Sequence, residues 1–155
     1  MSNSINPQSL SVDSLITDLK SLGYIADRGL ATSIFISMKL GKPILLEGEV
    51  GVGKTELAKT LAALYGRQLI RLQCYEGIDT NHALYEWDYA RQMLQIRAMN
   101  QADDTQASVE TLFGPQFLIE RPLLQAIRAG DQCVLLFDEI DRADDELEAF
   151  LLELL

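Results

Sequence analysis

The feature that most constrains this chain is a glycine-rich octapeptide, Gly48-Glu49-Val50-Gly51-Val52-Gly53-Lys54-Thr55. It follows the short apolar run Pro43-Ile44-Leu45-Leu46-Glu47, which is typical of a buried strand. It precedes Leu57, Leu61 and Leu64, which recur at helical spacing. Glycine lets a backbone wrap tightly between two elements because it adopts left-handed angles at little steric cost. The chain is therefore expected to place a strand, a tight loop and a helix in direct succession.

The octapeptide is also a full match to G-x-x-x-x-G-K-[ST], whose strand-to-helix context is met here. In such a loop the backbone N–H groups point at phosphate oxygens, and the positive end of the helix adds to the attraction. Lys54 would neutralise the β- and γ-phosphates, and the Thr55 hydroxyl would ligate Mg²⁺. The expected cofactors are ATP and Mg²⁺. The expected nucleotide-binding residues are Gly48, Glu49, Val50, Gly51, Val52, Gly53, Lys54, Thr55 and Glu56.

A second candidate element is the apolar run Cys133–Phe137, which ends in Asp138 and Glu139. Two acids after a strand are a weak signal alone, because they also cap helices. Downstream of a phosphate-binding loop, they predict that Asp138 holds Mg²⁺, partly through water, and that Glu139 orients and polarises the attacking water. Lys54 and Glu139 are thus the expected catalytic residues. Thr55 and Asp138 are the expected metal ligands.

The remaining patterns predict alternating helices and strands. Helices are expected near 10–22, 30–38, 54–65, 88–98 and 122–130 and from about 144, and strands at 43–47, 68–73 and 133–137. This alternation is typical of an α/β fold with a parallel sheet and flanking helices. The region 75–120 is less regular. Four of its aromatic residues, Tyr75, Tyr85, Trp87 and Tyr89, are expected to pack in a core, with client contact as the alternative. The expected domain organisation is an N-terminal helical segment, 1–23, followed by one domain, 24–155.

Composition and charge exclude several classes of protein. The chain has 13 Lys and Arg against 23 Asp and Glu, a net charge of −10, and no basic stripe that would neutralise nucleic-acid phosphates. No nucleic-acid partner is therefore expected. The longest apolar run, Cys133–Phe137, is far shorter than the roughly 20 residues of a membrane span, so no membrane insertion is expected. Two unpatterned cysteines and an N-terminus unlike a signal peptide favour a cytoplasmic location.

Two segments carry a family resemblance: LLEGEVGVGKTELAKTLA, from Leu45, and LLFDEIDRADDELEAFLLELL, from Leu135. They resemble the AAA+ ATPases of the MoxR type, and most closely the CoxD-like branch. The resemblance runs from about Tyr24 to Leu155 and covers the front part of the family's module. It implies a P-loop NTPase fold of the AAA+ type.

The resemblance further implies a ring-forming, ATP-driven chaperone that remodels complexes or matures metalloenzymes, often with a von Willebrand factor A-domain partner. The CoxD-like branch is associated with assembly of the molybdenum and copper centre of carbon monoxide dehydrogenase. The resemblance also places Tyr24-Ile25-Ala26-Asp27 near the adenine. The family's functional positions match here at Gly48, Gly51, Gly53, Lys54, Thr55, Asp138 and Glu139.

The sequence departs from the family pattern after the acidic helix. The family's sheet has order 5-1-4-3-2, so a fourth strand with a polar sensor residue would lie between 43–47 and 133–137. That strand, the arginine finger, the fifth strand and the helical lid do not occur in these 155 residues. We therefore expect ATP hydrolysis in the complete module. We expect this chain alone to be unstable, to aggregate or self-associate, and to have negligible ATPase activity. The alternatives are a non-hydrolysing nucleotide-binding remnant, or a P-loop ATPase or kinase acting on another substrate.

Overall fold

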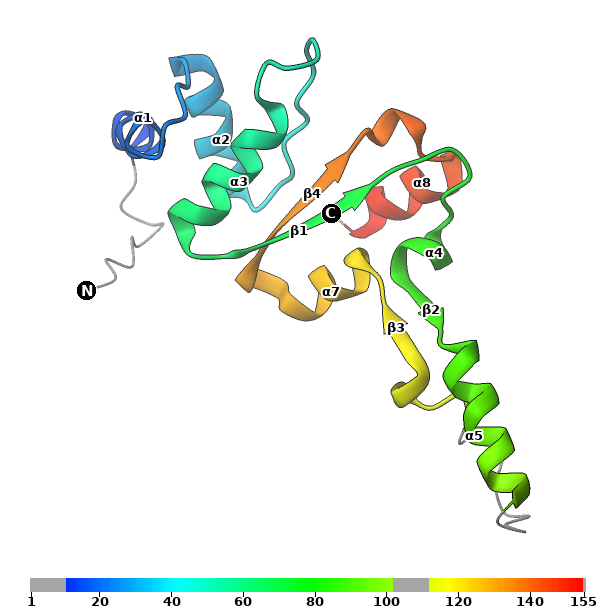
Figure 1. Cartoon of the computed structure of the whole chain (residues 1–155). Helices are drawn as coiled ribbons and strands as arrows, with labels where there is room; N and C mark the ends of the chain where they lie inside the picture. Colours follow the sequence, from blue (N-terminus) through cyan, green and yellow to red (C-terminus); the bar gives the residue numbers. More distant parts are fainter. Residues whose placement is uncertain (1–10, 102–111, 155) are drawn as a thin grey trace.

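A computed structural model of the chain describes residues 11–101 and 112–154 (Figure 1). The helices are α1 Val12–Ser21, α2 Arg28–Leu40, α3 Lys54–Tyr65, α4 Thr80–Leu84, α5 Tyr89–Gln101, α7 Pro122–Ala129 and α8 Asp145–Leu154. The strands are β1 Gln68–Gln73, β2 Tyr85–Trp87, β3 Leu118–Glu120 and β4 Cys133–Asp138. Short 3₁₀ turns are η2 Pro115–Phe117, η3 Gly130–Gln132 and η4 Ile140–Arg142. In these described ranges no helix is long and apolar enough to span a membrane.

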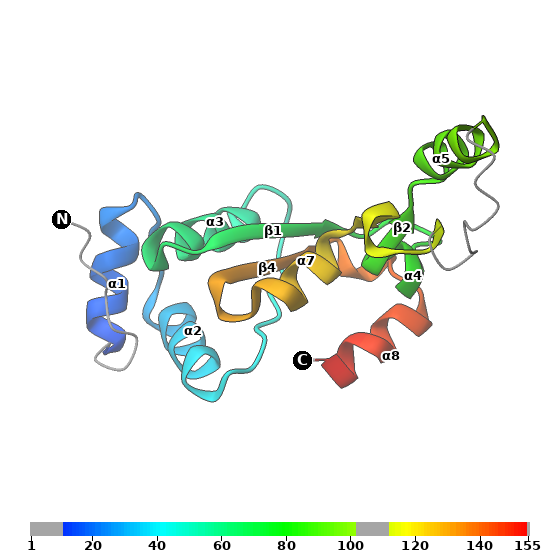
Figure 2. The ribbon, with the colours of Figure 1, turned by 90° about the horizontal axis from the view of Figure 1, so that it is seen from below.

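The centre of the fold is the parallel pair of β1 and β4. Its register runs from Gln68 opposite Cys133 to Gln73 opposite Asp138. Both strands occur where the sequence predicts them. Helices α3 and α7 pack against the pair, and they lie on opposite sides of it in both views (Figures 1 and 2). The expected α/β architecture, with a parallel sheet and flanking helices, is therefore present in a small form.

The predicted strand at 43–47 is wrong, because these residues form no strand ladder. Ile44 and Leu46 pack against the helices, whereas Leu45 between them is 70% exposed. This alternation is what an extended segment produces when it covers an apolar surface with one face. A strand also needs a hydrogen-bonded neighbour, and within the described residues β1 pairs only with β4. The segment therefore has the side-chain pattern of a strand without the pairing.

Apolar side chains gather in two separate clusters. The helical cluster joins α1, α2 and α3, and its buried members are Leu15, Leu19, Ala26, Ala31, Ile34 and Leu57. The sheet cluster lies where β1 meets α4, α7 and α8, and its buried members are Leu72, Cys74, Ile78, Ala83, Leu123, Leu147 and Leu151. Each cluster buries one face of several amphipathic helices, which is what stabilises short helices in proteins.

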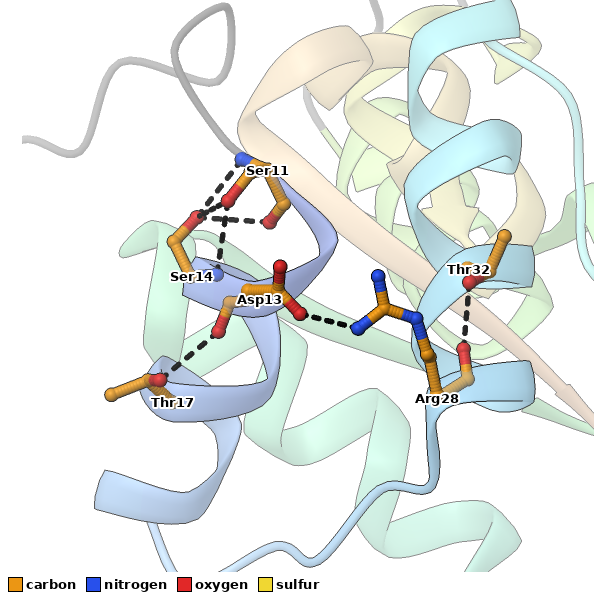
Figure 3. A network of polar contacts seen from close by, with 6 residues as sticks. All are labelled: Ser11, Asp13, Ser14, Thr17, Arg28 and Thr32. Atoms are coloured by element: carbon orange, nitrogen blue, oxygen red, sulfur yellow. Dashed lines mark hydrogen bonds and ion pairs between the residues drawn. The ribbon is translucent and has the colours of Figure 1, made fainter.

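Helix α1 begins at a reciprocal cap (Figure 3). The Ser14 backbone N–H donates to the Ser11 hydroxyl at 3.1 Å, and the Ser11 N–H donates to the Ser14 hydroxyl at 2.9 Å. Within the first turn of α1, Asp13 forms an ion pair of 2.6 Å with Arg28 at the start of α2. These contacts satisfy two of the N–H groups that a helix start leaves unpaired, and they link α1 to α2.

The region 75–120 contains elements that the sequence does not predict: α4 and an antiparallel pair, β2 with β3. Trp87 on β2 makes edge contacts with Tyr85 and Phe113, with ring centroids 5.9 Å and 5.3 Å apart. Tyr75 and Tyr89 are exposed. The expectation that all these aromatic residues pack in a core is therefore wrong for two of them. The rings of Tyr85, Trp87 and Phe113 therefore pack with one another and belong to neither apolar cluster.

We predict that Leu147→Ala lowers the free energy of unfolding by about 2–5 kcal/mol, because the substitution leaves a cavity in the sheet cluster. Leu147 is 0% exposed, whereas Leu152 on the same helix is 85% exposed. The matched control Leu152→Ala should change the free energy by less than about 0.5 kcal/mol. Urea denaturation followed by circular dichroism measures both. Equal effects of the two substitutions would contradict the packing described for α8.

Candidate functional site

The glycine-rich loop enters α3 through left-handed backbone angles. Gly51 has φ 87° and Gly53, the residue that caps the start of α3, has φ 95°. A Cβ atom on Gly53 would stand 3.6 Å from Cε2 of Tyr24, which is an ordinary contact. The angle, not lack of space, is therefore what favours glycine there. No side chain caps the helix start, so its N–H groups remain available for an anion.

Lys54 is the first residue of α3, and its side chain folds back over the loop. Its Nζ atom donates to the backbone oxygens of Gly48 and Glu49, both at 2.7 Å. These carbonyl groups give the ammonium ion neutral partners only. A phosphate group would offer it negatively charged acceptors, and the attraction between opposite charges would add to the hydrogen bonds.

The other predicted loop residues lie around this turn. Thr55 is half-buried in the first turn of α3, and Glu56 beside it is exposed and forms an ion pair of 3.0 Å with Lys59. That pair occupies the Glu56 carboxylate on the outside of the helix. The remaining predicted loop residues at the surface are Gly48, Glu49, Val50 and Val52.

The acidic pair lies at the carboxyl end of β4. Asp138 is the last residue of the strand, and Glu139 follows with φ 56° and ψ 47°. Among the described residues, Glu139 is the only one other than glycine with a positive φ. A residue with a side chain adopts this conformation at a cost, and such residues cluster at functional sites. The turn ends β4 sharply and directs the chain into η4.

Two arginines contact the acidic pair. Arg71 on β1 approaches Oδ2 of Asp138 twice, through Nε at 3.0 Å and Nη2 at 2.6 Å. Arg142 on η4 places its Nε 3.1 Å from Oε2 of Glu139. Arg142 follows Glu139 closely in the sequence, whereas Arg71 precedes Asp138 by 67 residues and no local pattern points to it. Only the β1–β4 register brings Arg71 to this place.

The two halves of the site are joined by packing. Helix α3 packs against β4 and runs in the opposite direction, so its N-terminal end lies toward the carboxyl end of that strand (Figures 1 and 2). No hydrogen bond or ion pair between described residues links the loop to Asp138 or Glu139. The acids instead pair with arginines, and the lysine with its own loop.

The oxygen donors suit Mg²⁺. Thr55 offers a hydroxyl and Asp138 a carboxylate, both hard oxygen ligands of the kind Mg²⁺ prefers. Within the described ranges, no three His, Cys, Asp or Glu side chains gather into a metal-binding group. Mg²⁺ is usually held by one or two protein groups plus the substrate's phosphates, and the hydroxyl of Thr55 and the carboxylate of Asp138 are donors of that kind.

Comparison with known families agrees with this geometry. Residues 43–155 match the AAA domain of the dynein-related subfamily. The chain belongs to this family. Membership in the AAA family implies a P-loop NTPase fold and nucleotide binding, and it accounts for the order of the glycine-rich loop, α3 and the acid-tipped β4. The match includes both halves of the site.

Proteins similar to this AAA chain include the uncharacterized protein SSP1341 of Staphylococcus saprophyticus, 30% identical over 109 residues and 70% of this chain. The uncharacterized protein SH1500 of Staphylococcus haemolyticus is 31% identical over 107 residues, 69% of this chain. The uncharacterized protein YojN of Bacillus subtilis is 27% identical over 125 residues, 80% of this chain. The chain spans about a third, 34%, of the length of each. No solved structure matches.

One free cysteine adjoins the acidic turn of this AAA domain. The Cys74 backbone N–H donates to the backbone oxygen of Asp138 at 2.9 Å, and its side chain is buried. Burial raises the pKa of the Cys74 thiol, and the negative charges of Asp138, Asp141 and Glu139 raise it further. A raised pKa leaves less thiolate at any given pH.

We therefore predict that Cys74 reacts with a thiol reagent more slowly than Cys133, which is only half-buried. The reaction of Cys74 should accelerate only when the pH rises above the usual range for a thiol, since the thiolate is the reacting form. The variants Cys133→Ser and Cys74→Ser isolate each thiol for rate measurements from neutral to alkaline pH. Equal rates and equal pH profiles would contradict the position given for Cys74.

Proposed function

We propose that this chain binds MgATP through the loop at 48–55 and the acid pair at the end of β4. The observation that carries the proposal is the conformation of the loop. Left-handed glycines lead into the start of α3, which no side chain caps, and Lys54 lies over the loop with carbonyl oxygens as its partners among the described residues. A polyanion there meets backbone N–H groups, a helix dipole and an ammonium ion together.

Each polar residue has a distinct proposed role. Lys54 contacts the β- and γ-phosphates and offsets their charge, and the Thr55 hydroxyl and Asp138 carboxylate hold Mg²⁺, the latter partly through water. When bound, Mg²⁺ neutralises charge on the phosphate oxygens. Glu139 orients the attacking water and accepts its proton. These roles divide ground-state binding, which depends on Lys54 and Thr55, from hydrolysis, which depends on Glu139.

The base of the nucleotide is proposed to lie near 24–27, the segment between α1 and α2. The ring of Tyr24 lies next to Gly53, the residue that caps the start of α3, and the neighbouring Ile25 is strongly exposed. An apolar side chain and an aromatic ring beside the phosphate loop provide a surface on which a flat base can stack.

At the level of the whole protein, we propose an ATP-driven, ring-forming AAA+ chaperone of the MoxR type, close to the CoxD-like branch. Its partners would be further copies of the chain, a von Willebrand factor A-domain protein and a metalloenzyme client, with a cytoplasmic location. The support is the sequence resemblance across both motifs, together with membership in the AAA family. Because the chain spans only about a third of its relatives, hydrolysis and remodelling are proposed for the complete module.

We predict that Lys54→Ala weakens MgATP binding by about 30- to 100-fold, since the loss of a charge-assisted contact to phosphate costs on the order of 2–3 kcal/mol. Lys59→Ala is the matched control, because Lys59 lies on the same helix and pairs with Glu56 on the exposed surface. Its affinity should stay within about twofold of the unmodified chain. Calorimetric titration gives all three constants. Equal affinities for Lys54→Ala and the unmodified chain would refute the assignment of the loop.

We predict that Glu139→Gln keeps MgATP bound but stops hydrolysis in a protein that carries the complete AAA module, because this side chain acts on water and not on the nucleotide. The drop in turnover should be about 100-fold or more, the range for removal of a general base. Glu148→Gln, an exposed position on α8, is the control. Phosphate release and nucleotide affinity are measured together. Unchanged turnover in Glu139→Gln would assign water activation to another residue.

A further inference from the structure

The proposed roles leave Arg71 unexplained. Its guanidinium makes two contacts, 3.0 Å and 2.6 Å, with the same oxygen of Asp138, the proposed metal ligand. The Asp138 side chain is only 22% exposed, whereas that of Arg71 is 51% exposed. A carboxylate with so little access to water needs a nearby positive charge, and Arg71 supplies one from the neighbouring strand.

Arg71 also has a second acceptor. Its Nη2 atom donates to Oε1 of Gln73, two residues along β1. Alternate residues of a strand share a face, so both side chains lie on the face of β1 opposite Leu72 and the sheet cluster. The guanidinium can therefore give up Asp138 and still keep a hydrogen-bond partner, which lowers the cost of leaving the carboxylate.

We propose that Arg71 is the resident counter-cation of Asp138, and that Mg²⁺ must take the carboxylate from it when the nucleotide is bound. This inference rests on the proposed MgATP site. Arg71 holds Oδ2 through one hydrogen bond from Nε and an ion-pair contact from Nη2, so a metal ion that approaches the same oxygen competes with the guanidinium. A guanidinium that stays on the carboxylate also repels the metal ion across a few ångströms of partly buried protein. Arg71 therefore sets how strongly Mg²⁺ favours nucleotide binding, because it competes with the metal ion for Asp138.

The test measures dissociation constants of a fluorescent ATP analogue for the 155-residue chain, with EDTA and with saturating MgCl₂. Arg71→Gln should bind the analogue about 3- to 10-fold more tightly with Mg²⁺, the range for release of one charge-assisted contact, and equally well in EDTA. Arg71→Lys keeps the charge but loses the two-atom contact of the guanidinium, so its dissociation constant with Mg²⁺ should lie between those of Arg71→Gln and the unmodified chain. Arg28→Gln is the control, since it removes an arginine whose ion pair with Asp13 lies far more exposed, between α1 and α2.

The outcomes separate the two proposals. No change with Mg²⁺ for Arg71→Gln, or weaker binding with Mg²⁺, would overturn the counter-cation role, and weaker binding would make Arg71 a support for the metal ligand instead. A change confined to EDTA would also overturn it, because Arg71 would then act on the phosphates directly. If the unmodified chain binds no analogue under either condition, the proposed MgATP function itself fails. Circular dichroism spectra confirm that each variant is folded.

Discussion

Hydrogen bonds between β1 and β4 join two distant stretches of sequence, and they bring Arg71 into contact with Asp138, 67 residues further along the chain. This pairing supplies the surface on which α3 and α7 pack, and it brings the carboxyl ends of both strands to one edge. Closing so long a loop is unfavourable in entropy, so the pair depends on the apolar contacts of Leu72 and its neighbours in the sheet cluster. The position of the acid pair is thus a consequence of packing on the opposite face of the sheet.

The same physical requirement explains why 43–47 is not a strand. Ile44 and Leu46 pack against the helical cluster, so the side chains of this segment alternate as they do in a half-buried strand. Its backbone lacks a neighbour among the described residues. In strand β4 the composition and the burial disagree, since Cys133–Phe137 is apolar throughout but each residue is only half-buried. Continuous apolar strands usually lie inside a sheet with both faces covered. Both segments therefore have a composition suited to deeper burial than the described residues provide.

How much could be predicted from sequence depends on whether the signal is local. Helix α3 has the bounds 54–65 that its leucine spacing predicts, because Gly53 and Gly66 adopt left-handed angles at its two ends. Strand β1 likewise matches 68–73. The strand predicted at 43–47 fails because pairing is not local. Strands of three residues, such as β2 and β3, show too little periodicity to be recognised, although the aromatic residues of β2 favour extended structure. The contact between Arg71 and Asp138 is not predictable from local sequence either, because it depends on the register between β1 and β4.

The charged side chains of Lys54, Asp138 and Glu139 have partners before any ligand binds, and this affects the stability of the folded chain. A partly buried carboxylate without a cation destabilises the chain that contains it, and removing one partner of such a pair is costly. Asp138 and Glu139 have arginines, and Lys54 has carbonyl oxygens. Under the proposed function, MgATP adds a polyanion and a cation together, so each protein charge exchanges one partner for another instead of gaining or losing one. The binding free energy is then the difference between the contacts that these side chains make with MgATP and the contacts that they make without it. The affinity therefore depends on Arg71 and Arg142 as well as on the residues that contact the nucleotide.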